Sequence, residues 1–407
     1  MAILVQKYGG TSLAGPGRLR AVAQRVASAG RNTVVVVSAR GDTTDRLLDL
    51  AGEAGGHHAA TRAARETDQL LATGEYMSAA LLALALERSG VRAVSLTGHQ
   101  AGIRVVGRHG AGVIDSIDTR RVRRELAAGR VVVVGGFQGS NAAGDVVTLG
   151  RGGSDTTAVA LAAALGARRC EIYTDVEGVY TADPRLVASA RKLRRVPAEV
   201  MVEMAFSGAK VLHARSAELA LAKGVELHVR SSLVQAEGTV VHGGEVTELE
   251  TGNPVTAVTS DSPVARVLVH ARDGRDLAPE ILALLAGKAV PGDLVARSGP
   301  YEDEFRMGFT IARDAVELIR GPLESVAAAH GGGVLVDADV AKVSLIGVGL
   351  LNRPEYLARM AAVLSDAGIP TCWVASSQAR ASVVVAGRHR VEALRLLHKE
   401  FGLADGD

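Results

Sequence analysis

Two runs of β-branched residues limit the folds that this chain can adopt. Thr33–Val37 is one such run, and Val131–Val134 is four consecutive valines. A strand with one exposed face alternates apolar and polar residues, whereas an uninterrupted run is typical of a parallel strand covered on both faces. Helical patterns, such as those at 18–29 and 70–88, separate the strand-like runs. The sequence therefore predicts an α/β fold with a mostly parallel sheet sandwiched by helices.

Glycine-rich and hydroxyl-rich clusters follow several of the expected strands. Further strands are expected at 3–5, 91–96, 170–173 and 225–229. In open parallel sheets, ligands bind beyond the carboxyl ends of the strands. The clusters that would meet there are Lys7–Thr11, Ser38–Thr44, Gly135–Gly139 and Thr174-Asp175.

Composition narrows the classes of function. The chain has 407 residues, of which 47% are apolar, and its net charge of +2 implies no general attraction to nucleic acid or to a membrane surface. No run approaches the roughly 20 apolar residues of a membrane span, and the N-terminus resembles no signal peptide. Cys170 and Cys372 lack metal-ligand spacing, so no protein metal site is expected. We expect a cytoplasmic protein.

A repeat follows residue 232. Residues 264–269 resemble residues 340–345, and similar helices and strands follow each at a period of roughly 75 residues, which suits two small βαββαβ modules. The expected organisation is a first domain at 1–235, a linker at 243–254, and modules at 255–335 and 338–403.

The turn Leu149–Thr157 combines three glycines with an arginine and a carboxylate. Ser154 and Asp155 stand where N-cap residues stand before the expected helix, and a helix N-terminus favours anions. Lys7 beside Gly9-Gly10 also suggests phosphate binding. The chain has neither a Walker loop nor the motifs of a protein kinase. A capped helix and a solvated lysine explain the same residues without a ligand.

Two later segments are also candidates for the site. Asp175–Arg185 contains several acids, a tyrosine and an arginine, which suits a nucleotide-binding lip as well as an ordinary surface loop. Ser207–His213 places Lys210 beside a glycine, and we interpret His213 as a packed histidine rather than a base.

Six motifs together carry a family resemblance. They are Lys7–Ser12, Val37–Thr44, Gly74-Glu75, Leu149–Thr157, Tyr173–Arg185 and Lys210–His213. In this order they resemble the aspartate kinases, which are members of the amino acid kinase family with tandem ACT modules. The resemblance covers nearly all of residues 1–232, and the repeat after residue 260 is similar to paired ACT modules, though more weakly.

The resemblance implies that ATP phosphorylates the β-carboxylate of L-aspartate. A carboxylate is already ionised at pH 7, so the acceptor needs no general base. By this resemblance, Lys7 and Lys210 would neutralise the transferring phosphoryl group, Asp155 would hold the two lysines, and Mg²⁺ would be carried by the ATP phosphates.

Substrate and nucleotide contacts are likewise expectations. Arg151 would grip the α-carboxylate and Glu75 the ammonium group, while Ser38, Thr44 and Ser154 would orient the β-carboxylate. Gly152 and Gly153 complete the expected substrate-binding turn. The expected nucleotide-binding residues are Lys7, Tyr8, Gly9, Gly10, Thr174, Asp175, Tyr180, Asp183, Arg185, Lys210 and Val211.

The ACT-like part departs from the family pattern. Asp273–Asp276 lacks the usual Asp-x-Pro-Gly, no Gln-Asn pair occurs at 294–299, and Ser376–Gln378 replaces Ser-Thr-Ser-Glu. We therefore expect weak or absent feedback inhibition, or an effector site rebuilt for another ligand. By analogy the chain would form a homodimer or a higher homo-oligomer through these modules. Two other functions stay open: a kinase of the same family acting on glutamate or N-acetylglutamate, and a non-catalytic ACT regulatory protein.

Overall fold

A computed structural model describes residues 2–30, 32–55, 64–243, 254–272, 275–298 and 304–404. These residues form two compact units. The first unit contains the described residues up to 179 together with 192–206 and 210–243, and the second contains 180–191, 207–209 and 254–404. The expected linker at 243–254 and the departure at Asp273-Gly274 lie almost wholly outside the described residues.

The main sheet of the first unit has eight strands in the order β10-β12-β11-β9-β1-β2-β6-β3. Every neighbouring pair is parallel except β11 and β12. The sheet confirms the α/β fold with a mostly parallel sheet. Its strands are β1 (Leu4–Tyr8), β2 (Thr33–Val37), β3 (Ala93–Leu96), β6 (Val131–Gly135), β9 (Arg169–Thr174), β10 (Arg195–Pro197), β11 (Glu226–Ser231) and β12 (Thr239–His242).

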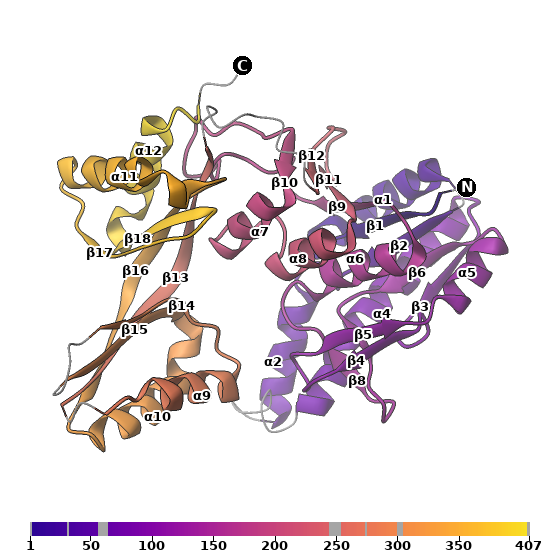
Figure 1. The fold of residues 1–407 in the computed structure, drawn as a ribbon. Coiled ribbons are helices and arrows are strands. Elements are labelled where there is room, and N and C mark those ends of the chain that lie inside the picture. The colour runs from indigo at the N-terminus through magenta and orange to yellow at the C-terminus, as the bar shows by residue number, and fades with distance from the viewer. Residues whose placement is uncertain are drawn as a thin grey trace. The chain divides into compact units, whose positions relative to one another are not determined.

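Helices cover the main sheet on both faces, as the fully buried β2 and β6 require (Figure 1). On one face α1 and α4 pack against each other and enclose a core that includes Tyr8, Val35 and Val133. On the other face α6 contacts β1, β2 and β9. The helices of this unit are α1 (Pro16–Ala29), α2 (Thr43–Gly55), α4 (Ala64–Arg88), α5 (Arg120–Ala127), α6 (Gly153–Leu165), α7 (Ala198–Phe206) and α8 (Ala214–Lys223).

Helix α4 is the long core helix of this unit. Among the described residues it is the one helix long and apolar enough to cross a membrane by length and composition alone. Half of that apolar window is buried inside the protein, with Leu82 and Leu86 fully enclosed. A core position accounts for its apolar character.

A second, four-stranded sheet flanks α4, and the sequence did not predict it. Its order is β5-β4-β7-β8, and its strands are only three to five residues long. Such short segments carry too few residues for an alternation pattern to be recognised. The strands are β4 (Ile103–Val106), β5 (Val113–Ile117), β7 (Gln138–Ser140) and β8 (Val146–Thr148).

The second unit is built on one six-stranded antiparallel sheet, drawn in salmon to yellow in Figure 1. Its order is β14-β15-β13-β16-β18-β17, with two long strands at the centre. The strands are β13 (Val255–Ala271), β14 (Asp293–Ser298), β15 (Phe305–Ala312), β16 (Gly333–Gly347), β17 (Thr371–Ser376) and β18 (Arg380–Ala386). The helices are α9 (Ala278–Lys288), α10 (Val316–Ala328), α11 (Pro354–Asp366) and α12 (Arg390–Glu400).

The two long strands divide between two hydrophobic cores. The first half of β13, including Val255 and Val258, packs with α11 and α12, whereas its second half packs with α9 and α10. An irregularity in the pairing between Asp261 and Val264 marks the division. The structure therefore groups residues differently from the expected ranges 255–335 and 338–403, because each long strand serves both cores.

Residues 180–191 also differ from the expected domain range 1–235. The backbone N–H of Val258 donates to the carbonyl of Thr181 at 2.8 Å, and the Thr181 hydroxyl bonds His398 Nε2 at 2.9 Å. These contacts bind the segment to the second unit, although it follows β9 of the first unit in sequence.

Candidate active site

A cavity of about 530 Å³ opens in the first unit. It lies at the carboxyl ends of β1 and β2 and at the turn that leads into α6. It brings together nine of the residues expected in the site. They are Lys7, Ser38, Thr44, Glu75, Arg151, Gly152, Gly153, Ser154 and Asp155. Residues more than a hundred positions apart thus share one wall, as expected at the carboxyl edge of a parallel sheet.

Lys7 and Asp155 form an ion pair inside this cavity. The Lys7 Nζ lies 2.6 Å from the Asp155 Oδ1, and the two side chains are only 12% and 13% exposed. Lys7 is directed to the face of the sheet that α6 covers, and Asp155 stands in the first turn of that helix. A Cβ on Gly9 would lie 3.6 Å from the same Nζ, so the amine also lies close to the backbone after β1.

Tyr8 does not line the cavity. The next residue along a strand faces the opposite side, and Tyr8 accordingly is fully buried in the core under α1 and α4. Its ring stacks on Tyr173 at a centroid distance of 4.7 Å, its hydroxyl donates to Gln6 Oε1, and burial raises its pKa. Its side chain therefore does not reach the cavity, and the expected nucleotide contact of Tyr8, which would have to come from its backbone, stays a prediction.

Glu75 is a buried carboxylate with one unused oxygen. It is 3% exposed on α4, and its Oε1 accepts a 3.0 Å hydrogen bond from the backbone N–H of Ala39. Its Oε2 has no hydrogen-bond partner among the described residues. Burial raises the pKa of Glu75 to about 7, against the lowering effect of the Ala39 N–H. A cation entering the cavity would satisfy the free oxygen and favour the ionised form.

The turn before α6 is formed differently from the N-cap that the sequence suggested. The helix begins at Gly153, and Gly152 is its N-cap in the left-handed conformation (φ +68°) without a side-chain cap bond. Ser154 and Asp155 are therefore inside the first turn, where their side chains reach the cavity. A Cβ on Gly152 would lie 2.1 Å from His213 Cγ, so this close packing also requires glycine.

Two basic side chains flank this turn. Arg151 is exposed and lines the cavity, whereas His213 packs beneath Gly152. Burial lowers the pKa of His213, Asp155 opposes that effect, and Arg215 and Arg151 reinforce it. A neutral, packed His213 matches its interpretation as a structural residue.

Other expected nucleotide contacts lie elsewhere. Lys210 is exposed before α8, and neither it nor Val211 lines the cavity. Thr174 donates a hydrogen bond to Asp175 at the end of β9. Tyr180, Asp183 and Arg185 belong to the second unit, where an ion pair with Arg185 lowers the pKa of Asp183. Their nucleotide contacts, and those of Gly9 and Gly10, stay predictions.

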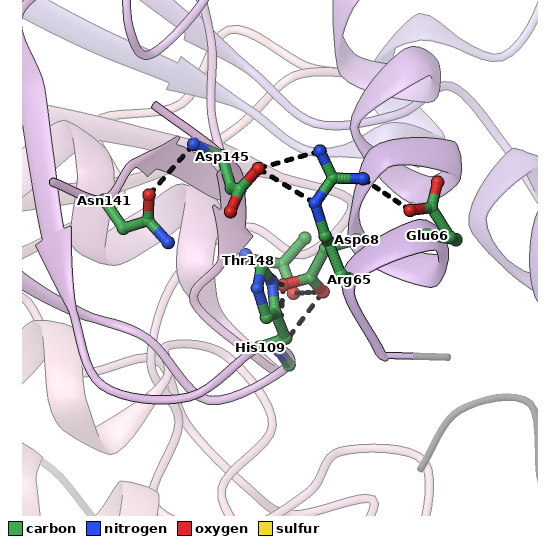
Figure 2. A network of polar contacts seen from close by, with 8 residues as sticks. Arg65, Glu66, Asp68, His109, Asn141, Asp145 and Thr148 are labelled. Atoms are coloured by element: carbon green, nitrogen blue, oxygen red, sulfur yellow. Dashed lines mark hydrogen bonds and ion pairs between the residues drawn. The ribbon is translucent and has the colours of Figure 1, made fainter. Parts of the chain in front are cut away.

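A polar network at the amino end of α4 was not predicted from the sequence (Figure 2). Asp68, which lines the cavity, accepts hydrogen bonds from His109, from the backbone N–H of Gly110 and from Thr148. Beside it, Arg65 pairs with Asp145, at 2.8 Å, and with Glu66. One signal was available: Asp68 precedes Glu75 by two helical turns, so both occupy one face of α4.

Known proteins resemble this chain in both sequence and fold. Residues 2–231 match the amino acid kinase family, and residues 343–401 match an ACT domain. The chain is 42% identical over 409 residues to an aspartokinase of Geobacillus stearothermophilus, covering 100% of this chain and 98% of that protein. It is 43% identical over 419 residues to an aspartokinase of Mycolicibacterium smegmatis, with coverages of 100% and 98%.

Solved structures agree with the sequence relatives. The structure of E. coli aspartokinase III in complex with aspartate and ADP has a TM-score of 0.84 and 26% identity, covering 98% of this chain and 99% of that chain. The family match spans the cavity with its lysine–aspartate pair and its buried glutamate, and the relatives cover the whole length. The chain therefore belongs to the aspartokinases of the amino acid kinase family, with a C-terminal ACT region.

Proposed function

We propose that the cavity binds L-aspartate and that the chain transfers the γ-phosphoryl group of ATP to the β-carboxylate of this substrate. The bond between Pγ and the bridging oxygen breaks, a bond forms to a β-carboxylate oxygen, and 4-phospho-L-aspartate and ADP are the products. The observation that carries this proposal is the unused Oε2 of Glu75 inside a cavity that also contains Arg151 and the Lys7–Asp155 pair.

The α-amino acid end of aspartate would lie between Arg151 and Glu75. The guanidinium group of Arg151 suits a bidentate contact with the α-carboxylate. The ammonium group would donate to Glu75 Oε2, which is buried and otherwise unpaired. An N-acylated substrate lacks this ammonium group, and this disfavours N-acetylglutamate.

The phosphoryl group would be transferred near Lys7. The ion pair with Asp155 fixes the Lys7 amine without using all of its three donors, so the amine can still neutralise charge on the transferring group. Ser38, Thr44 and Ser154 line the same cavity and would orient the acceptor carboxylate. Gly152 and Gly153 would offer their backbone to it.

The nucleotide would lie beyond the ends of β1 and β9. We assign it Gly9, Gly10, Thr174 and Asp175 in the first unit, and retain Lys210 as the second cation. Three described carboxylates line the cavity: Asp155 is paired with Lys7, Asp68 accepts hydrogen bonds from protein donors, and Glu75 is assigned to the substrate ammonium group. We therefore assign Mg²⁺ to the ATP phosphates, with which it would enter the site and where it would neutralise charge. Tyr180, Asp183, Arg185 and Val211 stay candidates for the nucleotide-binding side.

The remaining proposals concern the ACT region and the cellular setting. We assign catalysis to residues 1–235 and regulation or assembly to residues 255–403, with a homodimer or a higher homo-oligomer formed through the ACT region. The burial of α4 in the first unit supports a protein free of the membrane, located in the cytoplasm.

Coupled measurement of ADP release tests the proposed function. We expect release with L-aspartate, ATP and Mg²⁺ together, and background rates with glutamate, N-acetylglutamate or buffer. Replacing Arg151 with alanine removes a bidentate ionic contact, so the KM for aspartate should rise by roughly 100-fold or more. A normal KM in the Arg151→Ala enzyme contradicts the proposed contact, and faster turnover of glutamate contradicts the substrate.

A further inference from the structure

Asp68 is a buried carboxylate that faces the proposed aspartate cavity, and both of its oxygens accept hydrogen bonds from the protein. It is 1% exposed and lines the cavity from α4. Its Oδ2 accepts hydrogen bonds from Gly110 N at 3.0 Å, from Thr148 N at 2.9 Å and from His109 Nδ1 at 3.0 Å. Its Oδ1 accepts from Thr148 Oγ1 at 2.6 Å. Figure 2 shows His109 and Thr148 beside it.

Asp68 and Glu75 differ in whether their carboxylate oxygens already accept hydrogen bonds from the protein. Both carboxylates lie on the cavity face of α4, seven residues apart. Glu75 keeps a free oxygen for a ligand, whereas the oxygens of Asp68 are occupied by protein donors. Hydrogen bonds from backbone N–H groups to an ionised carboxylate are among the stronger ones in proteins. Asp68 is therefore suited to fixing the two segments that donate to it, 109–110 and 148.

These two segments hold the turn that carries Arg151. Gly112 N donates to the carbonyl of Thr148 at 2.8 Å, and a Cβ on Gly150 would lie 3.1 Å from the carbonyl of Gly110. The guanidinium group of Arg215 joins the same two segments, donating to Leu149 O at 2.7 Å and to Gly112 O at 2.8 Å. Residues 109–112 are thus bonded along residues 148–150, which lead directly into Arg151.

We propose that Asp68 is a positioning residue for substrate recognition, which holds Arg151 in place through segments 109–112 and 148–150. Helix α4 then positions both side chains that bind the amino acid end of the substrate. Glu75 contacts the ammonium group, and Asp68 positions the arginine that contacts the α-carboxylate. This inference rests on the proposed role of Arg151. Asp68 itself makes no contact with the substrate.

The Asp68→Asn enzyme tests the inference. Asparagine has one acceptor oxygen, so its NH₂ group must face a donor that the carboxylate formerly satisfied. The turn before α6 should loosen, and the KM for aspartate should rise by roughly tenfold or more, because small misplacements of a binding group are costly. The kcat and the KM for ATP should change by less than about threefold, since Lys7 and Asp155 are held by each other.

Asp145→Asn is the matched control. Asp145 pairs with Arg65 at the same end of α4, and the Arg65 side chain is 48% exposed. Neither residue lines the cavity, and among the described residues no hydrogen bond joins either of them to residues 109–112 or 148–150. Because exposed ion pairs contribute little, this enzyme should keep the wild-type constants for both substrates.

A second variant guards against misfolding of Asp68→Asn. Thr148→Val removes only the hydroxyl donor and preserves the shape of the side chain. The KM for aspartate should rise in this enzyme too, by a smaller factor. Thermal unfolding of each variant measures its stability separately from its kinetics.

Arg151→Ala distinguishes the failure of this inference from the failure of the proposed function. If Arg151→Ala leaves the KM for aspartate normal, the proposed contact fails and the inference falls with it. If Arg151→Ala raises that KM, then adding Asp68→Asn should raise it no further, because the two residues act through one contact. Three results would overturn the positioning role while leaving the proposed role of Arg151 intact. The first is a double variant whose KM for aspartate rises by the product of the two single increases. The others are an unchanged KM for aspartate in Asp68→Asn, and equal rises in the KM for aspartate and the KM for ATP in that enzyme.

Discussion

Replacing Glu75 with glutamine should make the protein more stable and a poorer aspartate kinase. Burial raises the pKa of this carboxyl from 4.5 to about 7, so the folded chain holds the acid in its less favoured ionised form above that pH. Glutamine keeps an oxygen for the Ala39 N–H and carries no charge to desolvate. The same substitution removes the anion that we assign to the substrate ammonium group.

The stability change follows from proton linkage. Below pH 4.5 both the folded and the unfolded chain hold Glu75 protonated, and the residue costs nothing. Between pH 4.5 and about 7 only the unfolded chain releases the proton, so folding loses about 1.4 kcal/mol per pH unit. At pH 8 the Glu75→Gln protein should therefore gain about 3 kcal/mol, a rise in Tm of roughly 6–12 °C at roughly 2–4 °C per kcal/mol. At pH 4 the two proteins should unfold alike.

The kinetic change runs in the opposite direction. Losing a charge-assisted hydrogen bond costs about 1.5–3 kcal/mol, so the KM for aspartate should rise by roughly 10- to 150-fold. In the wild-type enzyme, kcat/KM for aspartate should fall about tenfold for each pH unit below 7, as Glu75 takes up a proton. In the Glu75→Gln enzyme this part of the pH profile should disappear.

Calorimetry at pH 4 and pH 8, with initial rates between pH 5.5 and 8.5, measures both changes. Glu66→Gln is the control, because Glu66 lies on the same helix with a side chain that is 68% exposed, and both its Tm and its kinetics should stay as in the wild type. A lower Tm at pH 8, or an unchanged KM for aspartate, in the Glu75→Gln enzyme would refute the reasoning.

Three further predictions concern the phosphoryl site, the first strand and regulation. Lys7→Met should lower kcat by at least roughly 100-fold with a smaller change in the KM for aspartate, and steady-state kinetics with a folded enzyme would contradict this if kcat held. Tyr8→Phe should leave the KM for ATP within about twofold while lowering Tm slightly, because its hydroxyl bonds only Gln6 among the described residues; a large rise in the ATP KM would instead assign this hydroxyl a role in nucleotide binding. Lysine plus threonine at millimolar concentration should inhibit little, and strong inhibition would contradict the expectation drawn from Asp273–Asp276.

The sequence predicted the parts of the fold that long apolar runs determine. Thr33–Val37 is a buried parallel strand with the expected bounds, and Val131–Gly135 exceeds its expected range by one residue. Helix α4 begins at Ala64 rather than near residue 70, because its first turns are polar and carry Asp68. The short strands of the second sheet have no comparable pattern and were not predicted.

Within the site, residue type was easier to predict than side-chain direction. Lys7 and Tyr8 are adjacent in the motif, yet only Lys7 reaches the cavity, because a strand sends neighbouring side chains to opposite faces. Ser154 and Asp155 suggested a cap, but the left-handed Gly152 moved the helix start and turned both inward. Asp68 carries no motif of its own, and its role depends on a loop 42 residues away in the chain.

The pairing of β13 with β16 makes the second unit a nested insertion rather than two modules in series. The strand that completes the later module, Val255–Asp261, precedes the whole of the earlier one in the chain. During synthesis this strand is made long before its partner residues 342–347, and the residues of the earlier module are made between the two. The later module therefore cannot be exchanged between relatives as one continuous block, since a graft of 338–403 alone would leave Val255 and Val258 without their core.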